Sequence, residues 1–136
     1  MVKSILVVDD EPEVREVVGM VLSTLGGYKV AYAEDGLVAL QKLATFKPDL
    51  IVLDMMMLNM DGLSFMIELE QRGWCIPTLV LTAHVAAYDT AVKRLGTGCC
   101  MMKPFEVNDL LKRVQTVLRL APVLLPPATT TPPISL

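Results

Sequence analysis

The sequence predicts an α/β protein with a single five-stranded parallel sheet, doubly wound so that helices cover both of its faces. Short apolar runs of strand length alternate with longer segments whose apolar residues recur at helical spacing, in five successive units. The third run, residues 50–53, is apolar at every position, which is typical of a strand covered on both faces. A chain of 136 residues with 53% apolar composition suffices for one domain. This alternation favours right-handed crossovers between parallel strands.

The first unit opens with a strand expected at residues 5–8. The first helix is expected at residues 13–25, where valine and leucine recur every three or four positions. Pro12 stands where a first helical turn tolerates proline, and a Gly-Gly pair follows the helix as a stop signal. The second strand is expected at residues 28–33, and the second unit begins there.

The middle of the chain continues the alternation. Asp35 is expected to cap a helix at residues 35–46, which a proline closes two positions later. The all-apolar strand at residues 50–53 follows. The next helix is expected at residues 61–72 and ends at Gly73.

The last two units complete the predicted sheet. A fourth strand is expected at residues 78–81 and a helix at residues 86–95. A short fifth strand at residues 99–102 precedes a final helix at residues 106–119, whose apolar residues form one buried stripe.

The composition changes near residue 121. Residues 121–136 hold five prolines and no charged side chain, so neither a helix nor a central strand is expected there. We therefore expect one folded domain at residues 1–120 and a proline-rich linker or tail at residues 121–136.

Charge and hydropathy exclude several classes of function. The net charge is −3 and no basic block or stripe occurs, so we expect no direct contact with nucleic acid. No apolar stretch reaches the roughly 18 residues of a membrane span. The apolar run near the N-terminus ends in acids, unlike a signal peptide. We expect a soluble cytoplasmic protein without membrane contact.

The sulfur-containing residues are interpreted as structural. The three cysteines, Cys75, Cys99 and Cys100, have neither a disulfide framework nor zinc-ligand spacing. Cys99 and Cys100 are neighbours on a strand and are expected to point to opposite faces as small buried residues. The methionines at positions 55, 56, 57, 60, 101 and 102 are interpreted as flexible core fillers and not as Cu(I) ligands.

Polar residues follow four of the five predicted strands. Asp9 and Asp10 follow the first strand, Asp54 the third, Thr82 the fourth and Lys103 the fifth. Ligands of open parallel sheets bind beyond the carboxyl ends of the strands. Each residue alone is commonly a turn, a cap or a surface residue, so the prediction rests on their joint placement at one edge.

These residue types together indicate phosphoryl transfer to a carboxylate. Clustered carboxylates suit Mg²⁺ or Mn²⁺, because these cations prefer hard oxygen ligands and cancel the repulsion between the acids. Lys103 and the Thr82 hydroxyl supply donors for an anion beside the cation. A central carboxylate in such surroundings can act as the nucleophile.

Four segments resemble the receiver domain of two-component response regulators over about residues 3–120. They are VVDDEPE, IVLDMMMLNMDG, LVLTA and MMKPF, in this order and spacing. The resemblance implies the flavodoxin-like (β/α)5 receiver fold and a phosphorylation-controlled signalling switch. It implies no enzyme, apart from self-catalysed phosphotransfer from a phosphohistidine donor and slow autodephosphorylation.

The resemblance also implies a role for each site residue. Asp54 is the phospho-acceptor, and Asp10 binds Mg²⁺ with help from Asp9. The backbone carbonyl of Met56 and the carboxylate of Asp54 are further metal ligands. Thr82 bonds the phosphoryl group.

Three further roles follow from the same resemblance. Lys103 pairs with a phosphoryl oxygen, and a cis peptide bond to Pro104 aims it inward. Ala83 leaves space for the phosphoryl group. The donor is a histidine kinase, a phosphotransfer protein or acetyl phosphate, and the output is a downstream effector protein or a C-terminal output domain missing from this sequence.

Two positions, Cys100 and Leu58, depart from the family pattern, and two others, Met56 and His84, stand where the family tunes hydrolysis of the phosphoryl group. Cys100 stands at the switch position, where an aromatic is usual, so the signal is expected to travel more through the loop after Thr82. Leu58 replaces a usual proline, so its loop is expected to be looser. An apolar Met56 cannot orient water, so we expect slow self-dephosphorylation. His84, the only histidine, is interpreted as an exposed loop residue, with contact to the phosphoryl group as the alternative.

Two other functions stay open. A phosphate-independent receiver-like docking module is compatible with Cys100 and Leu58. A phosphohydrolase that forms an aspartyl phosphate is disfavoured, because Met56 stands where a general acid is needed.

Overall fold

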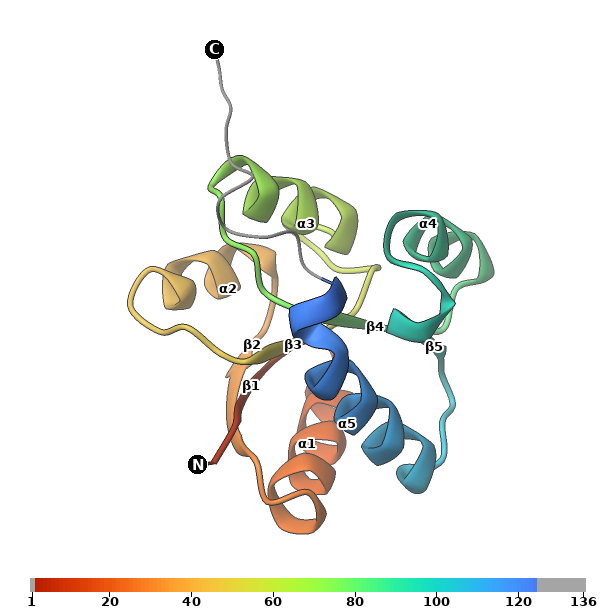
Figure 1. The fold of residues 1–136 in the computed structure, drawn as a ribbon. Coiled ribbons are helices and arrows are strands. Elements are labelled where there is room, and N and C mark those ends of the chain that lie inside the picture. Colours follow the sequence, from red (N-terminus) through yellow and green to blue (C-terminus); the bar gives the residue numbers. More distant parts are fainter. Residues whose placement is uncertain (1, 125–136) are drawn as a thin grey trace.

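The computed structural model describes residues 2–124, which form one five-stranded parallel sheet with helices on both faces (Figure 1). This confirms the predicted fold class. The strands are β1 (Ser4–Val8), β2 (Lys29–Ala33), β3 (Leu50–Leu53), β4 (Thr78–Thr82) and β5 (Cys100–Met102). Their order across the sheet is β2-β1-β3-β4-β5, so β2 and β5 form the edges and β3 lies at the centre.

The helices alternate with the strands along the chain. They are α1 (Pro12–Met20), α2 (Gly36–Leu43), α3 (Gly62–Gln71), α4 (Val85–Leu95) and α5 (Val107–Leu124). Two short turns join this set: a π-helical turn, η1 (Val21–Leu25), continues α1, and a 3-10 turn, η2 (Thr97–Cys99), precedes β5. In Figure 1, α1 and α5 lie on one side of the sheet and α2, α3 and α4 on the other.

Alternate residues of each strand belong to two separate cores. On β1, Leu6 and Val8 pack in the core beneath α2, α3 and α4, whereas Ile5 and Val7 pack beneath α1 and α5. All four residues of β3 are buried, as predicted for a strand covered on both faces. The two cores hold the central strands rigidly, and this positions the residues at their ends.

The first helix departs from its predicted regular course. After Met20 the backbone widens into η1, in which the Gly26 amide donates to the carbonyl of Val21 at 3.1 Å. Such a wide turn rotates the following side chains relative to an α-helix. Leu25, an apolar position of the predicted stripe, is consequently 63% exposed, while Leu22 stays fully buried.

The last helix is longer than predicted. The expectation that no helix occurs from residue 121 onward is wrong for residues 121–124, which continue α5 to Leu124. Proline adopts a helical φ, so Pro122 close to the helix end removes one backbone donor without ending the helix at once. Residues 125–136 lie outside the described residues, and the domain boundary at residue 120 stays a prediction.

The sulfur-containing residues are mostly placed as expected. Cys99 and Cys100 are buried and belong to opposite cores, which confirms that they point to opposite faces. Met55 and Met101 are core residues as predicted. For Met56 the prediction is wrong: it follows the end of β3, beyond the covered part of the sheet, and is 50% exposed.

The register brings the strand ends to one edge. Val8 of β1 lies opposite Leu53 of β3, and Thr82 of β4 lies opposite Met102 of β5. The residues that follow these positions therefore meet at the carboxyl edge of the sheet. Within the described part of the chain, none of the helices combines the length and apolar character needed to cross a bilayer.

Candidate functional site

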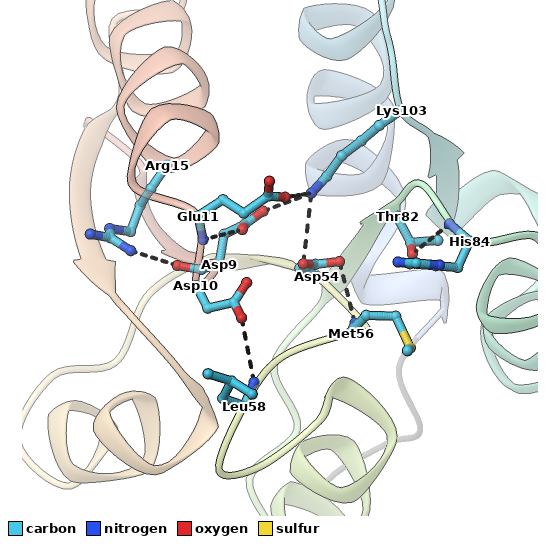
Figure 2. Close-up of polar contacts among 10 residues, drawn as sticks. All are labelled: Asp9, Asp10, Glu11, Arg15, Asp54, Met56, Leu58, Thr82, His84 and Lys103. Atoms are coloured by element: carbon cyan, nitrogen blue, oxygen red, sulfur yellow. Dashed lines mark hydrogen bonds and ion pairs between the residues drawn. The ribbon is translucent and has the colours of Figure 1, made fainter.

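The carboxyl edge of the sheet carries a cluster of ionisable side chains (Figure 2). Backbone hydrogen bonds fix the residues that bear them. The Asp54 amide donates to the carbonyl of Val8 at 3.0 Å, and the Asp9 amide donates to that of Ala33 at 3.2 Å. The sheet ladder thus extends one residue beyond β1 and β3 and fixes the Cα atoms of both aspartates. The Lys103 amide likewise donates to the Thr82 carbonyl at 2.8 Å.

Lys103 lies between the carboxylates. Its Nζ donates to Asp9 Oδ2 at 2.9 Å, and it lies 3.6 Å from Glu11 Oε1 and 3.7 Å from Asp54 Oδ2. The side chains of Asp9 and Asp54 are each 5% exposed and that of Lys103 is 11% exposed. The peptide bond between Lys103 and Pro104 is cis. The buried ammonium offsets part of the repulsion between the acids.

The surroundings shift the pKa of both central groups. Burial raises the pKa of Asp54 to about 6; the charge of Lys103 opposes this shift, and the charge of Asp9 adds to it. Burial alone lowers the pKa of Lys103, but its hydrogen bond to Asp9 and the charges of Asp54 and Glu11 outweigh that effect, so the net shift is upward. At neutral pH the Asp54 carboxylate is therefore mostly ionised beside a charged lysine.

A divalent cation fits the acidic cluster. Carboxylate oxygens of Asp9, Glu11 and Asp54 all lie within 4.8 Å of one another. These hard oxygen donors suit Mg²⁺ or Mn²⁺, which bind few carboxylates and retain several waters. The grouping differs from the predicted trio in one member, because Asp10 Oδ2 accepts a 3.4 Å hydrogen bond from the Leu58 amide instead. Sequence reasoning gave Glu11 no ligand role, although its position two residues after Asp9 was a usable signal.

The β4–α4 loop flanks the cluster. Thr82 is fully buried, and its Oγ1 accepts a 3.3 Å hydrogen bond from the His84 amide. His84 is exposed at the N-cap of α4, where its side chain makes no capping hydrogen bond. Ala83 is exposed and lines a hollow of about 530 Å³ that reaches Lys103 and Phe105.

The β3–α3 loop flanks the cluster on the other side. The Met56 amide approaches Asp54 Oδ1 at 3.4 Å, and its side chain extends away from Asp54 (Figure 2). Leu58 is 75% exposed. Met56 and Leu58 thus give the site an apolar outer rim. The role of the Met56 carbonyl as a metal ligand stays a prediction.

Cys100 lies away from the charged cluster, on β5. It is 1% exposed, and burial, followed by the neighbouring Cys99, raises the pKa of its thiol to about 11. It lines a hollow of about 480 Å³ with Tyr88 and Arg113. The Arg113 guanidinium donates to the backbone carbonyls of Thr97, Gly98 and Cys100, at 3.0, 3.3 and 3.0 Å.

Comparison with known proteins gives consistent matches. A model of the response regulator receiver domain family matches residues 5–115. The chain is 39% identical over 127 residues to the alkaline phosphatase synthesis transcriptional regulatory protein PhoP of Bacillus subtilis (strain 168), covering 93% of this chain and 52% of PhoP. It is 41% identical over 116 residues to the response regulator MprA of Mycobacterium sp. (strain KMS), covering 85% of this chain and 50% of MprA.

A solved structure gives the same result. The receiver domain of the Francisella response regulator 1452 superposes with a TM-score of 0.75 at 27% identity, covering 86% of this chain and 97% of that domain. The chain spans about half the length of the curated relatives it matches.

Proposed function

We propose, from the premise that the chain belongs to the response regulator receiver domain family, that Asp54 is the residue through which this receiver is switched. Receiver domains of two-component systems are phosphorylation-controlled, and the family binds Mg²⁺ at an acidic pocket. The observation that carries the assignment is the position of Asp54: it lies at the end of the central strand, 3.7 Å from Lys103 and within one cluster with Asp9 and Glu11.

The phosphoryl step forms one bond and breaks one. The ionised Asp54 oxygen attacks the phosphorus of a phosphohistidine on a histidine kinase or phosphotransfer protein, or of acetyl phosphate. The new bond joins that oxygen to phosphorus. The bond to the donor's nitrogen or oxygen breaks, and the leaving group keeps its electron pair. With a pKa of about 6, Asp54 is mostly deprotonated at pH 7, as the attack requires.

Asp9, Glu11 and Asp54 are the acids that would hold the divalent cation, and Asp10 would join them by leaving its 3.4 Å contact with Leu58. When bound, the cation neutralises negative charge on the transferring oxygens. Lys103 donates from its position between the carboxylates of the same cluster. An ammonium that already lies between two buried carboxylates needs only a small movement to reach a phosphoryl oxygen.

Thr82 links the phosphoryl group to the surface. Its hydroxyl accepts from the His84 amide, immediately before α4 begins. When the hydroxyl turns to donate to a phosphoryl oxygen, the His84 amide loses this partner, and the start of α4 is released. The partner-binding surface near α4 then changes without a movement of β5, whose switch position holds the small Cys100.

Self-dephosphorylation is slow in this proposal. The exposed Met56 thioether cannot orient an attacking water, and the His84 side chain makes no capping hydrogen bond at the start of α4 that would position it as a base. The chain is therefore a switch with limited self-catalysed chemistry and not a turnover enzyme.

The partners and the cellular compartment are proposals as well. The donor is a histidine kinase or phosphotransfer protein in the cytoplasm. The output is an effector protein or a C-terminal domain, in keeping with relatives about twice as long as this chain.

Intact-protein mass spectrometry tests the acceptor. The parent chain is incubated with acetyl phosphate and Mg²⁺, beside Asp54→Asn and the matched control Asp61→Asn, which changes an exposed aspartate at the N-cap of α3. We expect one phosphoryl adduct on the parent and on the Asp61 variant, none on the Asp54 variant, and none with EDTA.

A second ligand separates the alternatives. If the parent takes no phosphoryl group and beryllofluoride also fails to bind, the phosphorylation proposal is wrong and the phosphate-independent docking module replaces it. An adduct that persists in Asp54→Asn would assign the acceptor to another residue.

A further inference from the structure

The β3–α3 loop contains an unusual backbone conformation. Asn59 has φ 67°, in the left-handed region, and within residues 2–124 no other non-glycine residue has a positive φ. Asparagine tolerates this region better than most residues, but the conformation persists only where neighbouring groups hold it. The loop joins Asp54 to α3 and carries Met56 and Leu58 along the rim of the acidic cluster.

A buried carboxylate on another element holds Asn59. The Asn59 Nδ2 donates to Asp35 Oδ2 at 2.8 Å, and the other oxygen of Asp35 accepts from the Val38 amide at 2.9 Å as the N-cap of α2. Asp35 is 7% exposed. The hydrogen bond from the Val38 amide, followed by that from Asn59, holds the pKa of Asp35 below its ordinary value. The Asp35 carboxylate therefore stays ionised. Hydrogen bonds to a charged acceptor are the stronger kind.

The same end of α2 also receives an apolar contact from the loop. A Cβ on Gly36, the first residue of α2, would lie 2.8 Å from Met60 Cγ. The absence of a side chain at Gly36 therefore lets Met60 pack against the helix start. Asp35 and Gly36 together form a two-point support for residues 59 and 60.

The remaining hydrogen bonds of the loop are local or long. The Met60 amide donates to the Leu58 carbonyl at 2.7 Å, within the loop. The contact of the Leu58 amide with Asp10 measures 3.4 Å, and it is the contact that Asp10 gives up in the proposed cation site. Once Asp10 leaves, the Asp35–Asn59 hydrogen bond is the short side-chain tie between the loop and a distant element.

We propose that Asp35 and Asn59 are positioning residues for the cation and phosphoryl site, which they support through the loop without touching either group. This inference rests on the proposed function of that site. It also accounts for the loss of the usual proline at position 58. A proline would restrict the loop backbone there, and Leu58 does not; the hydrogen bond from Asn59 to Asp35 restrains the loop instead.

The test uses variants that remove or reverse the Asp35–Asn59 hydrogen bond in a chain that still folds. Asn59→Gly removes the side chain and keeps the positive φ at no strain, so the chain folds with a free loop. Asn59→Asp places two carboxylates face to face. The double variant Asp35→Asn with Asn59→Asp restores a donor and an acceptor in reversed order, and asparagine still caps α2. Asn108→Asp adds the same charge on the exposed start of α5 as a matched control.

Mn²⁺ affinity, measured by the EPR signal of the unbound ion, is the first readout. We expect Asn59→Gly to weaken binding roughly tenfold and Asn59→Asp to weaken it further, since residues that orient metal ligands have effects of about this size. The double variant recovers most of the loss, and Asn108→Asp binds like the parent. Amide hydrogen exchange at residues 56–58 without any metal is the second readout, and it speeds up in Asn59→Gly.

The outcomes distinguish two failures. If the parent itself binds no Mn²⁺ and takes no phosphoryl group, the proposed function fails. If the parent does both, but Asn59→Gly matches it in Mn²⁺ affinity and in amide exchange, the positioning role is overturned while the proposed function stands.

Discussion

Charged side chains are buried at the carboxyl ends of the strands and exposed at the amino ends. At the carboxyl edge, Asp9, Asp54 and Lys103 are nearly buried and act on one another. At the amino edge, an ion pair between Arg94 of α4 and Glu70 of α3 joins side chains that are 28% and 70% exposed. Water screens the second pair, whereas the first group interacts in surroundings of low dielectric.

This contrast shows how the chain separates stability from chemistry. Buried ionised groups are costly to fold, so their energies respond strongly to protonation, to a cation or to a new anion. The exposed pair responds weakly to each of these. The carboxyl edge can therefore act as the sensor, while the apolar cores maintain the fold. Three predictions test this contrast, from the largest expected effect to the smallest.

Replacement of Lys103 should have the largest effect on stability. In Lys103→Met the buried Asp9 and Asp54 lose their compensating charge, and we expect the free energy of unfolding at pH 7 to fall by about 3 kcal/mol. Urea denaturation in EDTA measures this. Lys93→Met, on the exposed face of α4, is the control and should stay within about 0.5 kcal/mol of the parent. If both variants lost the same free energy of unfolding, charge at the carboxyl edge would matter no more to stability than charge on the exposed surface.

The titration of Asp54 should have the second-largest effect, which is a pH dependence of the free energy of unfolding. Its pKa is about 6 in the folded chain and 3.8 as an ordinary aspartate, so between these values the folded chain holds a proton that the unfolded chain has released. The contribution of Asp54 to the free energy of unfolding therefore falls as pH rises from about 4 to about 6, by no more than about 3 kcal/mol, and is level above that.

Urea denaturation of the parent and of Asp54→Asn across this range shows the effect of Asp54 and its charged neighbours, because titrating groups remote from Asp54 cancel in the difference. The variant should lack the fall and be the more stable chain at pH 7. A difference between the two chains that does not change with pH would show that Asp54 titrates normally.

The exposed pair should show the smallest effect. Glu70→Gln removes its charge, and we expect the free energy of unfolding to change by less than about 0.5 kcal/mol, because both partners are hydrated. Thermal melts at low and high salt measure this change. A loss as large as that of Lys103→Met would mean that the amino edge is also electrostatically sensitive.

The sequence was sufficient to predict the fold and to place the main residues of the candidate site, because both follow from where the strands begin and end. Apolar runs locate β1 and β3, and in a parallel sheet the residues that follow them must meet at one edge. That rule places Asp9, Asp54 and Lys103 together without any knowledge of side-chain positions.

Details that depend on competing contacts were not accessible in this way. Whether Asp10 or Glu11 faces the cluster depends on a hydrogen bond to the Leu58 amide, which lies far away in the sequence. The tie from Asp35 to Asn59 also joins elements distant in the sequence, so local patterns showed Asp35 only as a helix cap. The exposure of Met56 follows from the course of a loop, which apolar composition does not predict.

The placement of the three cysteines has a practical consequence for labelling. Cys99 and Cys100 are buried in opposite cores, and burial raises the pKa of both thiols, whereas Cys75 is exposed. Since a maleimide reacts with accessible thiolates, the folded chain offers it a single site. Cys75 lies shortly before β4, at the amino edge and remote from the acidic cluster. A fluorophore attached there can report on the folded receiver while the proposed phosphoryl site stays unmodified.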